Sequence, residues 1–153
     1  MKVDEASTPS TAVGALLAGE AAWGVGRPET YAVLGDRARS LRAELRAMLG
    51  DLKARGLSVA AYGASAKGST LLNYCGVGRE TLDFVADRGP AKQGRYTPGS
   101  SLPILPPSAL LDRLPDVTLL LTWNFADEIL AQQAEYRRRG GRFLVPIPAP
   151  RLV

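Results

Sequence analysis

Apolar side chains recur every three or four residues along the first third of the chain, a spacing typical of amphipathic helices. Residues 11–23 predict a short helix, which the glycines and the proline at 24–28 end. Residues 28–55 predict a much longer helix, and Gly56 follows it where a helix C-terminus favours glycine. The apolar stripe of this long helix consists of Tyr31, Leu34, Ala38, Leu41, Leu45, Met48 and Leu52.

After Gly56 the pattern changes to short apolar runs separated by segments with helical spacing. The runs predict strands at 57–62, 82–87, 102–105, 116–122 and 142–146, with helices at about 69–74, 108–114 and 125–139. Strands that alternate with helices predict a parallel sheet covered on both faces. We therefore expect an α/β, Rossmann-like fold: a mostly parallel sheet of about five strands in the order 3-2-1-4-5, flanked by helices and preceded by a helical lead-in.

The expected organisation along the chain is simple. Residues 1–11 are polar and predict a disordered lead-in or an artificial boundary. Residues 12–153 predict a single Rossmann-like domain, with the long helix at about 28–55 in front of the sheet. The sequence contains no internal repeat.

The stretch from Tyr62 to Thr70, with the sequence YGASAKGST, lies between the first predicted strand and the next helix. A tight turn at a helix start gathers backbone N–H groups and the positive end of the helix dipole, which suit a phosphate or carboxylate. The candidate binding residues here are Gly63, Ala64, Ser65, Lys67, Gly68 and Ser69. The alternative is a turn of small residues that only lets helix and strand pack closely.

Known motifs fit this turn only in part. Ser65 stands where G-x-G-x-x-G has its middle glycine, although its hydroxyl can donate to a pyrophosphate. A P-loop does not fit, because Lys67 precedes Gly68 rather than following it. A nucleophile elbow does not fit either, since Lys67 occupies its last glycine position and the chain has no histidine to act as the base.

The end of the second predicted strand is expected at the same edge of the sheet as this turn. Asp87 ends that strand 24 residues after Gly63, close to the spacing of about 20 at which a dinucleotide-binding sheet has its ribose-binding acid. The alternative is that Asp87 caps the turn that follows it. Asp87 is therefore a candidate ligand-binding residue with a structural alternative.

The long segment 88–101 is rich in glycine and proline and has no periodicity. It brings two cations, an amide and an aromatic ring together, namely Lys92, Arg95, Gln93 and Tyr96. A base could stack on the tyrosine ring while the cations meet phosphate. The alternative is an exposed basic loop.

Trp123 and Asn124 follow the fourth predicted strand and are expected at the same edge. The Asn124 side chain can hydrogen-bond a ligand, or it can serve as the N-cap of the helix that follows. The convergence of this segment with the turn at 63–68 and the segment 87–101 is the main argument for a binding site.

Composition narrows the classes of function. The chain has 153 residues, enough for one domain with a real core, and its net charge of +4 is compatible with an anionic ligand. The absence of histidine removes His-based acid–base chemistry, Ser-His-Asp triads and most catalytic metal sites. The one cysteine, Cys75, excludes an internal disulfide and a multi-cysteine zinc site, and we expect a buried structural thiol.

Several kinds of partner are not expected. The sequence lacks the dense basic patch with interleaved aromatic residues that is typical of nucleic-acid binding. It also lacks an apolar run long enough to span a bilayer and the apolar core of a signal peptide. We therefore expect a cytoplasmic protein that binds neither nucleic acid nor membrane.

Four motifs occur in the order found in one protein family: YGASAKGSTLLN at 62–73, DRGPAKQGRYTPG at 87–99, LTWNFADEI at 121–129 and GGRFLVPIP at 140–148. On these motifs, residues 12–153 resemble the C-terminal domain of S-adenosylmethionine-dependent nucleotide-sugar C-methyltransferases. These enzymes make branched deoxysugars for antibiotics and cell-surface glycans.

The resemblance implies an enzyme of three parts: a cysteine-rich zinc domain, a methyltransferase domain that holds the methyl donor, and a Rossmann-like domain that binds the nucleotide part of the sugar substrate. In such an enzyme a base removes the proton beside the keto group, and the resulting enolate carbon accepts the methyl group. This chain lacks the zinc cysteines, a second Gly-rich strand–turn unit for the methyl donor, and the histidines and tyrosines that the family's central domain supplies for deprotonating the 4-keto-sugar. S-adenosylmethionine and structural zinc are therefore expected only in the missing domains.

The function implied by the resemblance is to hold the dTDP part of a 4-keto-deoxysugar for methyl transfer by a domain absent from this chain. The implied partners are a nucleotide-diphosphate sugar and the remaining domains, and the chain alone is expected to have no catalytic residue, metal or cofactor. Two alternatives remain: an NAD- or CoA-type cofactor-binding domain, and a non-catalytic Rossmann-like scaffold. Ser65 in place of the middle glycine counts against a standard NAD site.

Overall fold

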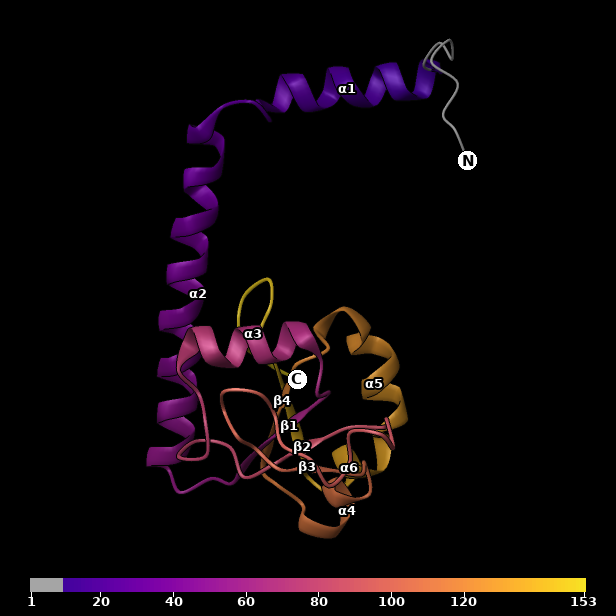
Figure 1. Ribbon diagram of the computed structural model, residues 1–153. Helices are drawn as coiled ribbons and strands as arrows, with labels where there is room; N and C mark the ends of the chain where they lie inside the picture. The colour runs from indigo at the N-terminus through magenta and orange to yellow at the C-terminus, as the bar shows by residue number, and fades with distance from the viewer. Residues whose placement is uncertain (1–9) are drawn as a thin grey trace. The chain divides into compact units, whose positions relative to one another are not determined.

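The structure, a computed structural model, describes residues 10–153 (Figure 1). The chain divides into two compact units, one that ends at Arg39 and one that comprises Ser40–Val153. Helices α1 (Thr11–Trp23) and α2 (Pro28–Ala54) confirm the two helices expected from the apolar spacing. The expected lead-in at 1–11 lies, as far as residue 9, outside the described residues.

Local contacts define the corner between α1 and α2 in the first unit. Gly24 ends α1 with a φ of 88°, and its carbonyl accepts a hydrogen bond from Thr30 Oγ1 at 2.9 Å. The rings of Trp23 and Tyr31 pack edge to face with their centroids 5.8 Å apart. Because α1 buries none of its residues, these contacts rather than a hydrophobic core order the corner.

The second unit is built on a six-stranded sheet in the order β3-β2-β1-β4-β5-β6. The strands are β1 (Val59–Tyr62), β2 (Val85–Ala86), β3 (Ile104–Leu105), β4 (Val117–Leu120), β5 (Arg142–Val145) and β6 (Arg151–Leu152). All neighbouring strands are parallel except β5 and β6. The Rossmann-like α/β fold and the order of the first five strands are confirmed, and β6 is added at one edge.

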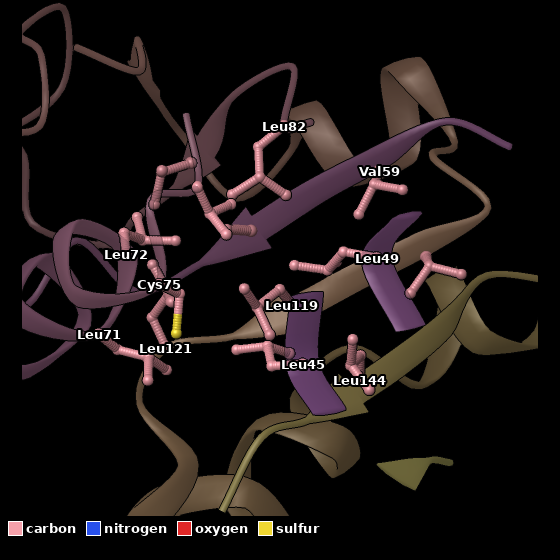
Figure 2. Packing of buried hydrophobic residues seen from close by; sticks show 14 of the residues in the cluster. Leu45, Leu49, Val59, Leu71, Leu72, Cys75, Leu82, Leu119, Leu121 and Leu144 are labelled. Carbon is pink, nitrogen blue, oxygen red and sulfur yellow. The ribbon is translucent and has the colours of Figure 1, made fainter. Parts of the chain in front are cut away.

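Alternate side chains of β1 enter two separate apolar clusters, as expected for a sheet covered on both faces. Val59 and Ala61 join the cluster covered by α2 and by α3 (Ala66–Cys75), which Figure 2 shows from close by. Ala60 and Tyr62 join the cluster covered by α4 (Ala109–Arg113), α5 (Ala126–Gln132) and α6 (Ala134–Arg138). In Figure 1, α3 and α5 accordingly lie on opposite sides of the strands.

Cys75 and Tyr136 illustrate how the two clusters treat polar atoms. Cys75 is fully buried beneath α2, which confirms the expected structural thiol, and burial raises its pKa. Tyr136 is fully buried in the other cluster, where its hydroxyl accepts from Thr118 Oγ1 at 2.9 Å and donates to the Pro115 carbonyl at 2.7 Å. Burial raises the pKa of Tyr136 to about 12. A buried hydroxyl in this fold is therefore supplied with partners.

Several element boundaries differ from the predicted ones, and the strands expected at 57–62, 102–105 and 116–122 are each shorter in the structure. The helix expected at 69–74 begins at Ala66, because Ser65 caps it. The helix expected at 125–139 is divided into α5 and α6, because Gln133 (φ −98°, ψ 26°) leaves the helical conformation. The strand expected at 82–87 is reduced to β2, although the bond from the Asp83 N–H to the Val59 carbonyl continues the contact with β1.

Candidate functional site

The turn after β1 approaches the residues that follow β4 so closely that glycine is required twice. Gly63 has a φ of 94°, and a Cβ there would lie 2.5 Å from Cγ2 and 2.7 Å from Oγ1 of Thr122. A Cβ at Gly68, in the first turn of α3, would lie 2.7 Å from Cβ of Leu121. The alternative expected for this turn, close packing of helix and strand, is therefore a real role of both glycines.

Most backbone N–H groups of the turn are bonded within the chain itself. Ser65 is the N-cap of α3 and its Oγ accepts from the Gly68 N–H at 3.1 Å, so its hydroxyl oxygen serves the helix. The Ala64 N–H donates to Asp87 Oδ2 at 2.7 Å. Within residues 10–153, the N–H groups of Ala66 and Lys67 have no such partner. The open donors of the turn thus lie at the helix start.

Asp87 joins the turn to the segment that follows β2. It is only 7% exposed, and its Oδ2 accepts from Ala64 N–H and from Lys92 Nζ, the latter at 3.2 Å. Its Oδ1 accepts from the Gly89 N–H at 2.7 Å, which confirms the turn-capping role expected as the alternative. The Gln93 side chain donates to the Asp87 carbonyl at 2.9 Å. Asp87 therefore fixes two loops against each other.

Lys67, Trp123 and Asn124 form a cluster beside the start of α3. Lys67 Nζ donates to Asn124 Oδ1 at 2.8 Å and lies 5.2 Å from the centroid of the Trp123 ring. The lysine is thus exposed, and its ammonium contacts two neighbouring side chains. The N-cap role considered for Asn124 is wrong, because Asn124 lies in the short 3-10 turn η1 (Trp123–Phe125) and Phe125 precedes the first residue of α5.

A cleft of about 460 Å³ opens at the carboxyl ends of β1, β2 and β4. Its lining comprises Tyr62, Gly63, Asp87, Arg88, Gly89, Lys92, Thr122, Phe125, Glu128 and Ile129. Of the residues predicted from sequence, Gly63, Asp87 and Lys92 meet here, and the three segments expected to converge do so. The cleft occupies the position between β1 and β4 at which connections leave to opposite faces of the sheet.

Two hydroxyls at this cleft were missed by sequence reasoning. The side-chain oxygens of Tyr62 and Thr122 are buried, and no described residue bonds to either one. Burial raises the pKa of the Tyr62 phenol, and the nearby Arg88 charge opposes that rise. The Gln133 amide also opposes the rise, although it makes no hydrogen bond to the phenol in this structure. A polar residue at the end of an otherwise apolar strand was the available signal for both positions.

The charged residues of the cleft occur in opposite pairs. Lys92 Nζ lies 3.2 Å from Asp87 Oδ2, and Arg88 lies 3.8 Å from Glu128 Oε1 and donates to Gln132 Oε1 at 3.2 Å. Because the lining holds two cations and two carboxylates, it carries no net formal charge. Lys67 adds a positive charge at the same edge of the sheet, but it lies outside the lining of the cleft.

Arg95 and Tyr96 lie outside the lining of this cleft. Tyr96 pairs with Pro103 through an isolated antiparallel bridge, and the guanidinium of Arg79 lies 5.4 Å from the centroid of its ring. The Tyr96 side chain remains 61% exposed. Residues 94–97 of this segment are therefore hydrogen-bonded to residues 102–104, and the Tyr96 ring lies beside Arg79.

Among residues 10–153, no three His, Cys, Asp or Glu side chains are grouped closely enough to hold a metal ion. No helix in the described part of the chain is both long and apolar enough to cross a membrane.

Fold and cleft together define a Rossmann-like domain with a cleft at the carboxyl edge of its sheet. The chain belongs to the family described as the C-methyltransferase C-terminal domain, whose model matches residues 1–148. It is 42% identical to the C-methyltransferase NovU of Streptomyces niveus over 142 residues, which are 93% of this chain and 34% of that protein. The chain thus spans about a third of the length of this relative.

Proposed function

We propose that the chain is the nucleotide-sugar-binding C-terminal domain of an S-adenosylmethionine-dependent sugar C-methyltransferase. It holds the dTDP part of a 4-keto-deoxysugar while another domain transfers the methyl group. Family membership supports the link to C-methyltransferases. The observation that carries the binding role is the cleft lined by Gly63, Asp87 and Thr122, which follow three neighbouring strands. Rossmann-like sheets bind nucleotides at this position.

In this proposal the diphosphate lies at the start of α3, beside the cleft. The N–H groups of Ala66 and Lys67 point out of the first helical turn, where the helix dipole favours an anion. The Lys67 ammonium adds a full charge, and its bond to Asn124 restricts the ammonium before a ligand arrives. Such restriction lowers the entropy lost on binding.

The other predicted residues support this placement in different ways. Asp87, Lys92 and Gln93 hold the two loops together, as their hydrogen bonds indicate. Arg95 and the exposed ring of Tyr96 are candidate contacts for the base, on the side of the molecule where Arg79 lies.

The division of labour in the proposed enzyme follows from the residues present. S-adenosylmethionine supplies the methyl group in another domain, and structural zinc also belongs elsewhere. Without a histidine, this chain contributes binding energy from remote parts of the substrate, which orients the sugar for the reaction.

The test is a calorimetric titration of the 153-residue chain with dTDP-glucose, NAD and coenzyme A. We expect dTDP-glucose to bind and Lys67→Ala to weaken it about tenfold, because a charge-assisted contact is lost. Lys53→Ala, which removes the same side chain from the last turn of α2, is the matched control and should leave the affinity unchanged. Supplied with methyl donor and a 4-keto-sugar nucleotide, the chain alone should give no methylated product.

Each rival function has its own outcome in this experiment. Binding of NAD or coenzyme A in preference to dTDP-glucose would identify a cofactor domain. A scaffold with a decayed site would bind none of the three and would be indifferent to both Lys67→Ala and Tyr96→Ala. Turnover by the isolated chain would contradict the assignment of catalysis to another domain.

A further inference from the structure

We propose that the cleft at the carboxyl edge receives a neutral, hydroxyl-bearing ring, the sugar portion of a nucleotide sugar, and that the hydroxyls of Tyr62 and Thr122 are its hydrogen-bond partners. This inference rests on the function proposed above and names the part of the ligand that each half of the site takes. The chemistry is shared by the hexose and the ribose of such a ligand.

Two buried hydroxyls at the cleft have no hydrogen-bond partner among the described residues. Tyr62 is only 3% exposed, yet neither its oxygen nor Thr122 Oγ1 has a partner among the described residues. Elsewhere in the same cluster, Tyr136 bonds to Thr118 and to the Pro115 carbonyl. An unpaired buried polar atom costs free energy, and a ligand that pairs it recovers that cost on binding.

The charged side chains of the cleft balance one another. Arg88 faces Glu128 and Lys92 faces Asp87, so a phosphate would meet as much negative as positive charge. A hydroxylated ring can instead donate to the carboxylates and accept from the cations without disturbing either pair. The balance therefore favours a neutral polyol over an anion in this cleft, while Lys67 lies outside it.

The walls of the cleft combine apolar and polar side chains. Phe125 and Ile129 contribute apolar surface to the lining, and aromatic faces stack on the C–H side of sugar rings. The volume of about 460 Å³ lies in the range of small-molecule sites. Since the two oxygens are buried, entry of a ring requires a lining side chain to change rotamer. Phe125 is 55% exposed, so its ring can move without breaking a hydrogen bond or an ion pair.

The experiment compares Tyr62→Phe with Tyr136→Phe in the full chain, by thermal unfolding and by titration with dTDP-glucose. Tyr62→Phe removes an unpaired hydroxyl, so we expect an equal or higher Tm and an affinity lowered about tenfold. Tyr136→Phe removes a fully bonded hydroxyl, so we expect a lower Tm and an unchanged affinity. Thr122→Val and Thr118→Val form a second matched pair with the same expected contrast.

The choice of ligand distinguishes the two sources of the ring. A loss confined to dTDP-glucose assigns the cleft to the hexose, and an equal loss with dTDP assigns it to the ribose; both support the proposal. A similar loss with inorganic pyrophosphate overturns it, because the cleft would then bind phosphate.

Two further results would separate this inference from the function on which it rests. If dTDP-glucose binds and Tyr62→Phe lowers Tm without changing affinity, a buried water satisfies the hydroxyl and only the inference fails. If the unmodified chain binds no nucleotide, the proposed function fails and the inference fails with it.

Discussion

At the scale of single residues, the turn after β1 depends on a residue without a Cβ atom at position 63. Gly63 combines a left-handed backbone, with a φ of 94°, and a close approach to the side chain of Thr122. Either property alone favours glycine, but they act through different physical causes. A left-handed backbone brings a Cβ too close to the residue's own carbonyl oxygen, whereas the close approach brings a Cβ into collision with Thr122. The chain contains a second glycine that separates the two effects.

Gly140 has a φ of 99° and no atom within 4 Å of the position that a Cβ would take. We expect Gly140→Ala to cost about 1–2 kcal/mol of unfolding free energy from the backbone term alone. Gly63→Ala should cost about 1–3 kcal/mol more, because Thr122 must move. Urea unfolding of both variants measures the difference. Equal costs would mean that Thr122 accommodates the methyl group freely.

At the scale of elements, the start of α3 is set by the side chain of Ser65, which the sequence also offers as a donor to a bound phosphate. Ser65 accepts from the Gly68 N–H and so begins the helix at Ala66, before the predicted start. In the proposed site the diphosphate therefore uses the two following N–H groups, because the Ser65 hydroxyl donates to the Leu121 carbonyl at 3.5 Å. The cap and the proposed anion site therefore share one turn but use different atoms.

Ser65→Ala should lower the unfolding free energy by about 1 kcal/mol, since the Gly68 N–H loses its partner. Ser108→Ala is the matched control. Ser108 stands before α4 in the same position, but its side chain makes no capping bond, so we expect almost no change. A loss of stability in the control as large as that in Ser65→Ala would show that the measured effect does not come from capping.

The helices and the strand order could be predicted because each rests on a long or strongly apolar signal. The stripe from Tyr31 to Leu52 needs no tertiary information to indicate α2. Strand β6 could not be predicted, because Arg151 and Leu152 are too few to show an alternation and follow a proline-rich segment. The break at Gln133 was missed for a similar reason, since a local backbone turn leaves the apolar period intact.

The candidate site was predictable only as far as strand ends can be located. Gly63 and Asp87 were found because they lie at the ends of apolar runs, and parallel strands bring such positions to one edge. Lys92 was found because it lies with other polar residues in the long segment 88–101. The sequence does not say which hydroxyl keeps a partner after folding. Tyr62 and Tyr136 are both buried tyrosines, and only their three-dimensional surroundings distinguish the bonded one from the unbonded one. Tyr62 and Thr122 were missed for that reason.

At the scale of the whole molecule, the hydrophobic core is confined to the second unit. The buried hydrophobic residues of the described chain begin at Leu45, and helix α2 contributes only Leu45, Leu49 and Leu52. Residues 10–39 therefore bury no large apolar side chain. Because burial of apolar surface is the main favourable contribution to folding, stability should reside in Ser40–Val153.

A chain shortened to Ser40–Val153 should unfold at the same urea concentration as the full chain, because its core is complete. A chain that begins after Gly50 is the control, since it loses the fully buried Leu45 and the almost fully buried Leu49; each such loss costs about 2–5 kcal/mol. Circular dichroism during urea titration measures both. A lower midpoint for the first variant would place part of the stability in residues that precede Ser40.

The steric demand at Gly63 and Gly68 has a consequence for how this fold drifts over evolutionary time. A descendant that lost its ligand would still keep both glycines, because Thr122 and Leu121 would collide with any replacement. Nothing in the packing would keep the oxygens at Tyr62 and Thr122 in such a lineage, and phenylalanine and valine would fit there without an unpaired atom. Under the proposed function, retention of the two hydroxyls, rather than of the two glycines, would indicate selection for binding.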